Sequence, residues 1–358
     1  MTMDDAREEV SMQGPVCPRP LTRDEQVVLG HGSGGRMTQD LITNFFYPPF
    51  ENPILLRGDD AAVVTMPERG RLALSTDSHI VSPLFFPGGD IGRLAICGTV
   101  NDLAMVGAHP LWLTAGFILE EGLPLEILER VVGSMKVAAE EAGVIIVAGD
   151  TKVAEREKVD RLFVNTTGIG WVPEGREVSG TNAHPGDVVL LSGPIGDHGI
   201  AVLAARGELA FETTVESDLA PLNVLVEKMF EVSRAIHVMR DPTRGGLATS
   251  LNEIACQSEV AIRLDETSIP VRPAVAAACE MLGFDPLYVA NEGKLVAMVS
   301  AEEAEEVLEA MRLTPYGEEA CRIGVVEESP PGRVLMRTAI GGTRVVDILS
   351  GEMLPRIC

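Results

Sequence analysis

Residues 111–148 read LWLTAGFILEEGLPLEILERVVGSMKVAAEEAGVIIVA, and they carry the clearest structural signal in the chain. Leu111–Ile118 and Val144–Ala148 are short apolar runs typical of buried strands. Between them, Leu125–Ala142 repeats apolar side chains at helical spacing. The repeating residues are Leu125, Leu128, Val131, Val132 and Met135. The stretch therefore predicts a strand, a helix and a second strand in succession.

The same alternation extends over the first half of the chain. Further strands are expected at Ala61–Val64, Leu72–Thr76 and Leu162–Val172, and another helix at Asp90–Gly107. Residues 1–26 are polar and contain prolines, so we expect a flexible arm there and a first domain over residues 27–176.

A cluster of turn-forming residues, Asn182–Asp187, follows, and we place the domain boundary just upstream of it. A second domain would span residues 177–348. Its expected strands are Val188–Leu191, Val260–Leu264, Leu295–Val299 and Arg322–Val326, with a closing hairpin at Gly341-Gly342. Its expected helices are His198–Arg206, Leu222–Ser233, Gly246–Gln257, Pro273–Leu282 and Glu302–Arg312. Because strands sometimes follow one another directly, two α+β domains with mixed sheets fit better than one doubly wound sheet.

The chain has a strongly negative charge. Of its 358 residues 46% are hydrophobic, and the formal charge is −24. Such a charge repels nucleic acid and anionic membranes. No stretch approaches the ~18 uninterrupted apolar residues of a membrane span, and the first 25 residues contain no apolar signal segment. We expect a cytoplasmic protein that binds neither nucleic acid nor membrane.

The six cysteines are widely spaced without a C-x-x-C pair, which argues against a disulfide framework or a zinc knuckle. Cys97, Cys256 and Cys279 lie in apolar, helix-like stretches, so we expect all three to be buried. Cys358 is the last residue, and Pro355 has no N–H to donate. Residues 349–358 are therefore expected to form a mobile, non-helical tail, of which eight extended residues reach roughly 26 Å.

Gly30-His31-Gly32-Ser33-Gly34-Gly35 is a glycine-rich loop. It matches G-x-G-x-x-G formally, but only Val27–Leu29 precedes it as an apolar run, and Arg36-Met37 replaces the Lys and Ser or Thr of a P-loop. Consecutive glycines still expose backbone N–H groups to a close anion. Gly32, Gly34 and Gly35 are candidate phosphate contacts, with a plain surface turn as the alternative.

Acidic residues recur beside apolar runs and small-residue turns. Singly, each fits a helix cap or a solvated turn, but together they suggest a site with more than one Mg²⁺ that bridges a nucleotide's phosphates. Lys152 would add a cation beside Asp150. The candidate nucleotide contacts are Asp59, Asp60, Asp77, Asn101, Asp102, Asp150 and Asp241. Those expected to hold Mg²⁺ are Asp60, Asp77, Asp102, Asp150 and Asp241.

These segments together resemble the ATP-binding superfamily of aminoimidazole ribonucleotide synthetase, selenophosphate synthetase and thiamine monophosphate kinase. Within it, the chain is similar to the carbamoyl dehydratases of [NiFe] hydrogenase maturation. The resemblance runs from about residue 27 to the end, and its most specific part is Pro355-Arg356-Ile357-Cys358, which the sister enzymes lack. The other matching segments are Gly30–Gly35, Asp59–Val63, Thr76–His79, Pro83–Gly107, Ala148–Val153, Ser192-Gly193, Gly196–Gly199, Met239–Leu247 and Asp285–Leu295.

The resemblance implies a homodimer whose first domains pair their sheets into a barrel, with ATP near the junction of the two domains. A partner carbamoyltransferase, HypF, would load a carbamoyl group onto Cys358. ATP-dependent dehydration would turn this group into a thiocyanate, and the HypC–HypD complex would receive the cyanide as an iron ligand.

That reaction removes an oxygen, which is a poor leaving group, and two nitrogen-bound protons. Transfer of the ATP γ-phosphoryl to the oxygen makes it part of a leaving phosphate, and Mg²⁺ would offset the charge. By motif, Glu292 and Lys152 match the family's catalytic pair, with Glu292 as the base and Lys152 tuning it. Without the resemblance, the two would read as a solvated ion pair. His79 and His198 are secondary candidates.

Two other functions stay open at the level of sequence. A small-molecule ATP enzyme, such as a selenophosphate synthetase, would need a reactive cysteine near the glycine loop, whereas Cys17 lies thirteen residues upstream of Gly30 in a different context. A non-enzymatic carrier would only present Cys358 to its partners, with a regulatory nucleotide site.

Overall fold

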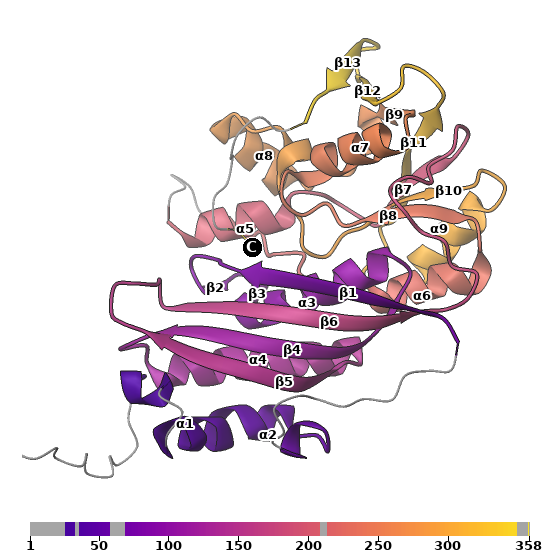
Figure 1. Ribbon diagram of the computed structural model, residues 1–358. Helices are drawn as coiled ribbons and strands as arrows, with labels where there is room; N and C mark the ends of the chain where they lie inside the picture. The colour runs from indigo at the N-terminus through magenta and orange to yellow at the C-terminus, as the bar shows by residue number, and fades with distance from the viewer. Residues whose placement is uncertain (1–25, 33–35, 58–68, 208–212, 349–356, 358) are drawn as a thin grey trace, which may run out of the picture.

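The computed structural model describes residues 26–32, 36–57, 69–207, 213–348 and 357. Two mixed sheets dominate it, one in each half of the chain, and the second lies above the first in Figure 1. The expected α+β class is confirmed. The predicted division between residues 176 and 177 falls in the connection between the sheets, and as a domain boundary it stays a prediction.

The first sheet has the strand order β1-β6-β4-β5. Its strands are β1 (Arg71–His79), β4 (His109–Glu120), β5 (Ile145–Ala154) and β6 (Leu162–Val172). Helix α4 (Leu125–Ala142) joins β4 to β5, which are parallel, while the other pairs are antiparallel. The predicted strand, helix and strand are thus confirmed. Gly143 ends α4 in the left-handed conformation, with φ +70°.

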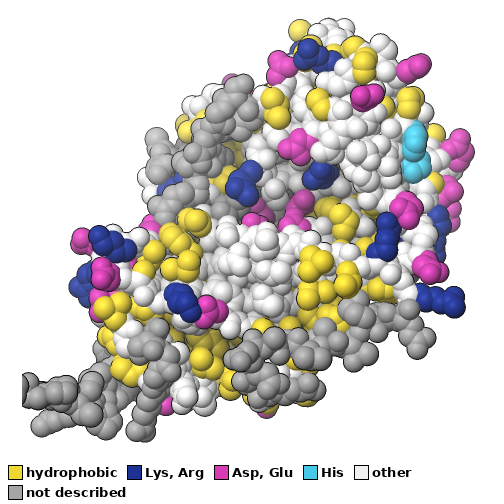
Figure 2. Space-filling view, viewed as in Figure 1, with side chains coloured by type: hydrophobic (Ala, Val, Ile, Leu, Met, Phe, Trp, Pro, Cys, Tyr) yellow, Lys and Arg dark blue, Asp and Glu magenta, His cyan; other side chains and the backbone are white. Residues whose placement is uncertain are grey.

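Helices cover only one face of this sheet. Helix α3 (Ile91–Met105) begins at Asp90, whose side chain accepts hydrogen bonds from the N–H groups of Gly92 and Arg93. α3 packs on β1 and β6, and α3 and α4 pack on each other. The opposite face turns toward the viewer in Figures 1 and 2, with hydrophobic side chains toward both ends of the strands and mostly uncharged polar groups in the centre.

Short elements precede this sheet, and the sequence patterns did not predict them. They are η1 (Leu29–Gly32), α1 (Arg36–Leu41), the π-helix η2 (Ile42–Phe46), α2 (Tyr47–Phe50), η3 (Leu55–Arg57) and the small hairpin β2 (Phe85–Phe86) with β3 (Gly89–Asp90). Each is shorter than the window over which hydrophobic periodicity can be recognised. The strand expected at Ala61–Val64 lies outside the described residues.

The second sheet has the order β13-β12-β9-β11-β7-β10-β8, with β12 and β9 parallel and the other neighbours antiparallel. Its strands are β7 (Val188–Leu191), β8 (Ile236–Arg240), β9 (Ala261–Asp265), β10 (Val296–Val299), β11 (Cys321–Glu327), β12 (Arg333–Arg337) and β13 (Thr343–Val346). β12 and β13 form the predicted hairpin. β8 was not predicted, because its alternation of apolar and polar residues spans only five residues.

All five helices predicted for the second half are present. They are α5 (Asp197–Ala205), α6 (Asn223–Val232), α7 (Gly246–Gln257), α8 (Pro273–Leu282) and α9 (Ala304–Arg312), with short 3-10 turns η4 (Glu266–Ser268) and η5 (Pro286–Tyr288). Within the described ranges, no helix is both long and apolar enough to cross a membrane.

The expectation for one cysteine is wrong. Cys97 and Cys279 are buried, as predicted, but Cys256 is exposed. α7 packs the face that contains Leu251, Ile254 and Ala255 onto the sheet. The next residue is rotated by about 100° around the helix axis, which turns Cys256 toward solvent.

Candidate active site

Four of the predicted acidic residues meet where the two halves of the chain join. Asp77 lies on β1, Asp102 on α3, Asp241 directly after β8, and Glu292 in the loop before β10. Their charges act on one another: Asp77, Asp102 and Asp241 all raise the pKa of Glu292. The convergence expected from the sequence therefore holds for these four carboxyl groups.

The carboxyl groups of Asp102 and Asp241 are partly desolvated. Asp102 Oδ2 accepts a 2.6 Å hydrogen bond from the Ser75 hydroxyl, and burial raises the pKa of Asp102 above its usual range. Burial, together with the charge of Asp102, raises the pKa of Asp241 to about 7. Both carboxyl groups therefore hold a proton more tightly than a solvated aspartate does.

Glu292 is buried, with 4% of its surface exposed. Its backbone N–H donates to Asp218 Oδ1 across 3.0 Å, and its side-chain Oε1 has no hydrogen-bond partner among the described residues. Burial, followed by the charges of Asp241 and Asp218, raises the pKa of Glu292 well above its ordinary value. The carboxylate is therefore a stronger base than a solvated glutamate.

The loop around Glu292 is held tightly on both sides. Asn291 Oδ1 accepts a 2.7 Å bond from the N–H of Gly196, and Asn291 Nδ2 donates to the carbonyl of Pro242 across 2.9 Å. A Cβ on Gly293 would lie 1.7 Å from the Asp218 carbonyl oxygen, so only glycine allows this approach. Glu292 is thus fixed against Asp218 and the residues after β8.

Both polar atoms of the Asn101 side chain form hydrogen bonds with backbone groups. Its Nδ2 donates to the carbonyl oxygens of Ala220 (3.0 Å) and Glu292 (3.3 Å), and its Oδ1 accepts from the N–H of Leu222 (2.8 Å). In this conformation Asn101 joins α3 to the Glu292 loop. Its expected contact with nucleotide stays a prediction.

Lys152 and Asp150 lie apart from the four carboxyl groups that meet at the junction. The two side chains form an ion pair at 2.9 Å, each 69% exposed. In the sheet, Asp77 lies opposite Thr166, Thr166 opposite Ala115, and Ala115 opposite Gly149. Because side chains alternate along a strand, Asp150 points to the face opposite that of Asp77.

The sequence did not reveal this difference, since it arises from the sheet register. The expected pairing of Lys152 with Glu292 is absent from the protomer, where Lys152 contacts Asp150 instead.

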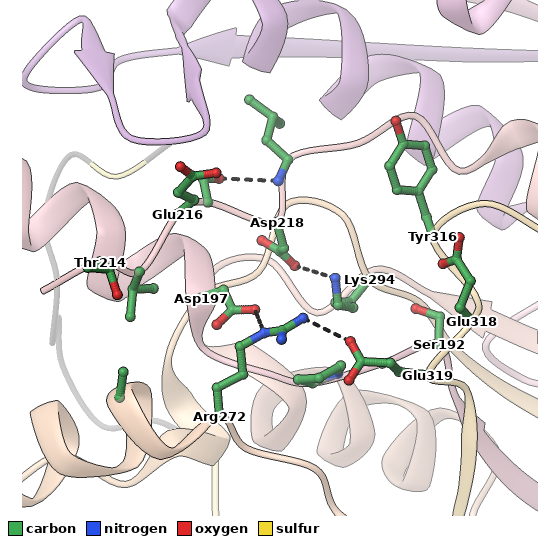
Figure 3. A pocket seen from close by; sticks show the side chains of 16 residues that line it. Ser192, Asp197, Thr214, Glu216, Asp218, Arg272, Lys294, Tyr316, Glu318 and Glu319 are labelled. Carbon is green, nitrogen blue, oxygen red and sulfur yellow. Dashed lines mark hydrogen bonds and ion pairs between the residues drawn. The ribbon is translucent and has the colours of Figure 1, made fainter.

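A cavity of about 500 Å³ opens beside Asp218 and Lys294. Figure 3 shows Lys294 pointing at Asp218 and Arg272 bridging Asp197 and Glu319, and the corresponding distances are 3.2, 3.0 and 2.8 Å. Sequence reasoning missed these residues. Lys294 could have been found, since it stands two positions after Glu292, but Asp218 lies in no recognisable motif.

Ile357, the described end of the tail, is docked beside the cavity that Ser217 and Asp218 line. His198 Nε2 donates to the Ile357 carbonyl oxygen across 2.7 Å, and Ile357 forms a β-bridge with Val81. Burial lowers the pKa of His198, so the ring is neutral, and its Nδ1 accepts from the Ser217 hydroxyl at 2.8 Å. Ser217 is the neighbour of Asp218, which holds Glu292. Cys358 and the predicted contacts Gly34, Gly35, Asp59 and Asp60 lie outside the described residues, and Gly32 ends η1.

Comparison with known proteins identifies the family. The model of the N-terminal domain of AIR synthase related proteins matches residues 58–172, and that of the C-terminal domain matches residues 184–337. The carbamoyl dehydratase HypE of Cupriavidus necator is 56% identical over 341 residues, which cover 95% of this chain and 97% of the relative. The chain belongs to the HypE family of carbamoyl dehydratases.

Solved HypE structures have the same fold. A hydrogenase maturation protein HypE in complex with ATP aligns with a TM-score of 0.89 and 53% identity, over 92% of this chain and 99% of that one. HypE from a HypE–HypF complex aligns with a TM-score of 0.76 and 51% identity, over 88% and 100%. The resemblance seen in the sequence is confirmed, and with it the hydrogenase maturation function of the HypE family.

Proposed function

We propose that this protein dehydrates an S-carbamoyl group on its own Cys358 to a thiocyanate, with conversion of ATP to ADP and phosphate. The observation that carries the proposal is that the residue before Cys358 is held by His198 next to the loop that positions Glu292. The ATP-bound HypE relative supports the choice of nucleotide.

The carboxyl group of Glu292 acts as the base in this proposal. Phosphoryl transfer to the carbamoyl oxygen makes that oxygen part of a good leaving group, and loss of phosphate with two nitrogen-bound protons forms the C≡N bond. The desolvated environment that raises the pKa of Glu292 also strengthens it as a proton acceptor. Its unpartnered Oε1 leaves a lone pair available for the substrate N–H.

Asp77, Asp102 and Asp241 form the cation-binding side of the proposed site. Their oxygen donors suit Mg²⁺, and their mutual repulsion in the protomer is relieved when a cation binds between them. Bound Mg²⁺ would supply charge neutralisation for the triphosphate. Asp59 and Asp60 remain proposed ligands from the sequence motif, and Gly32, Gly34 and Gly35 remain proposed phosphate contacts.

We also propose a homodimer formed through the uncovered face of the first sheet. Leu72, Leu74, Ile118 and Ile145 are exposed there despite their size, and a second copy would bury them. Because Asp150 and Lys152 lie on the same face, dimerisation brings their charges into the interface, and the family motif that includes both still favours a role in the reaction. We therefore keep both residues in the proposed site.

Two partners complete the proposal. The carbamoyl group is supplied by HypF, in line with the solved HypE–HypF complex, and the cyanide passes to HypC–HypD. The test is phosphate release by the carbamoylated protein in MgATP. One phosphate per carbamoyl group, and none with Cys358→Ala, would support the proposal. Equal release by both proteins would exclude chemistry at the tail.

A further inference from the structure

Two histidines and an aspartate converge away from the carboxylate site. His184 and Asp187 lie in the turn before β7, and His237 lies on β8. Each offers one ligand atom, and the three atoms lie within 4.8 Å of one another. Among the described residues this is the one group of its kind, and we propose that it is a binding site for a divalent transition metal such as Zn²⁺.

The spacing of the donor atoms fits a tetrahedral ion. Metal–nitrogen bonds of about 2.0–2.1 Å at tetrahedral angles place neighbouring ligand atoms roughly 3.3 Å apart. The Nδ1 atoms of His184 and His237 are 3.4 Å apart. His237 Nδ1 lies 2.9 and 3.0 Å from the two oxygens of Asp187. All three ligand atoms lie within 4.8 Å of one another, so any pair wider than the tetrahedral spacing must close up when an ion binds between them.

The hydrogen bonds among His184, Asp187 and His237 cannot use every nitrogen lone pair of the two imidazole rings. His237 Nδ1 faces both Asp187 and the Nδ1 of His184, and a single ring nitrogen carries at most one proton. If that proton goes to Asp187, the two imidazole nitrogens face each other without a shared proton. A cation that displaces this proton to solvent would accept a lone pair from each of the three atoms.

Asp187 is built into the fold as a fixed ligand. Its side chain is 4% exposed, and Oδ2 also accepts a 2.9 Å bond from the backbone N–H of His184. Within the described ranges its one ion-pair partner is His237, so no Lys or Arg neutralises it there. The hydrogen bond from the His184 N–H to Asp187 also fixes the turn that carries His184. It therefore pre-orients two of the three ligands, His184 and Asp187.

The donor types define the class of metal. Imidazole and carboxylate together suit Zn²⁺, Ni²⁺ or Cu²⁺, whereas Mg²⁺ prefers oxygen ligands only. The site is thus chemically distinct from the Mg²⁺ site proposed above. His184 is exposed, so the fourth coordination position faces solvent and can hold water.

One strand, β8, connects this site to the proposed Mg²⁺ site. His237 is the second residue of β8, and Asp241 directly follows the strand. Four residues of extended chain separate them by about 13 Å. A metal on His237 would fix the start of the strand whose end carries Asp241.

The experiment uses the full-length, untagged protein after dialysis against a chelator. Co²⁺ is titrated while its visible absorption, which is strong only in tetrahedral sites, is recorded, and Zn²⁺ is then added in competition. The variants are His184→Ala, which alters an exposed side chain, and His237→Ala. His109→Gln is the matched control, since His109 lies outside the group and pairs with Glu227.

We expect the natural protein and His109→Gln to bind one equivalent of Co²⁺ with a tetrahedral spectrum that Zn²⁺ abolishes. Both other variants should bind it at least ten-fold more weakly. Subtracting the His184→Ala titration removes any cobalt bound by cysteines. The same affinity and spectrum in His184→Ala, or no tetrahedral spectrum in the natural protein, would overturn the proposal.

Discussion

His198 Nε2 and the carbonyl oxygen of Ile357 are 2.7 Å apart in a buried hydrogen bond that joins α5 to the end of the chain. Ile357 is itself buried and packs into an apolar cluster to which both halves of the chain contribute. The sequence suggested a mobile tail, and the structure shows that its penultimate residue has a defined docking place. Docking at Ile357 is how we propose that Cys358 is delivered to the site.

Weakening this bond should loosen the tail. Replacing His198 with Phe removes the donor of this bond and should speed hydrogen exchange of the C-terminal peptide by about five-fold, because a neutral hydrogen bond contributes about 1 kcal/mol. Ile357→Ala keeps the carbonyl but removes buried apolar contacts, and should speed exchange at least as much. Exchange is measured by mass spectrometry after proteolysis. His109→Gln is the control and should leave it unchanged. Unaltered exchange in both tail variants would mean that the docking contact is not significant in solution.

Glu292→Gln should separate binding from chemistry. Gln has the same shape but cannot accept a proton, so we expect ATP affinity within a few-fold of the natural value and dehydration slowed by at least 100-fold. Affinity is measured by calorimetry and dehydration by intact mass. The exposed Glu328→Gln serves as the control. Full dehydration by Glu292→Gln would remove Glu292 from the mechanism.

Asp241 should make stability depend on pH in a defined direction. Its pKa of about 7 lies above the ordinary value of 3.8, so the folded state holds this proton more tightly than the unfolded state. The contribution of Asp241 to the free energy of unfolding is therefore complete below about pH 4 and is lost as the pH rises toward 7. Asp241→Asn should gain stability relative to the natural protein over this range.

The gain should level off above pH 7 at about 1–2 kcal/mol, because the partial exposure of Asp241 reduces the full effect of the shift. Melting curves of both proteins between pH 5 and 8, recorded without nucleotide or metal, measure it. A difference in Tm that stays constant across this range would show that Asp241 is not the titrating group.

The uncovered sheet face leads to a prediction about assembly. Leu74 is 68% exposed in the protomer, and a charge there should prevent burial against a second copy. We expect Leu74→Glu to sediment as a monomer and the natural protein as a dimer. Ile340→Glu changes a residue that is 97% exposed on the β12–β13 turn and should stay dimeric. A dimeric Leu74→Glu protein would place the interface elsewhere.

The elements with a clear apolar pattern could be predicted from the sequence, and parts of the site could not. α4, β6, β7, α7 and α8 begin and end at the predicted residues, because periodicity and terminal Gly or Pro mark them. The grouping of Asp77, Asp102 and Asp241 was predicted from their places beside apolar runs and turns, and Glu292 was assigned by motif resemblance. The separation of Lys152 from Glu292 depends on which face of β5 carries Lys152, and the registers of β4, β5 and β6 set that.

The most direct measurement of the central claim is the intact mass of protein that carries a carbamoyl group on Cys358. Addition of MgATP should lower this mass by one water, with the change located in the C-terminal peptide. Hydrolysis of ATP with an unchanged carbamoyl mass would contradict the account.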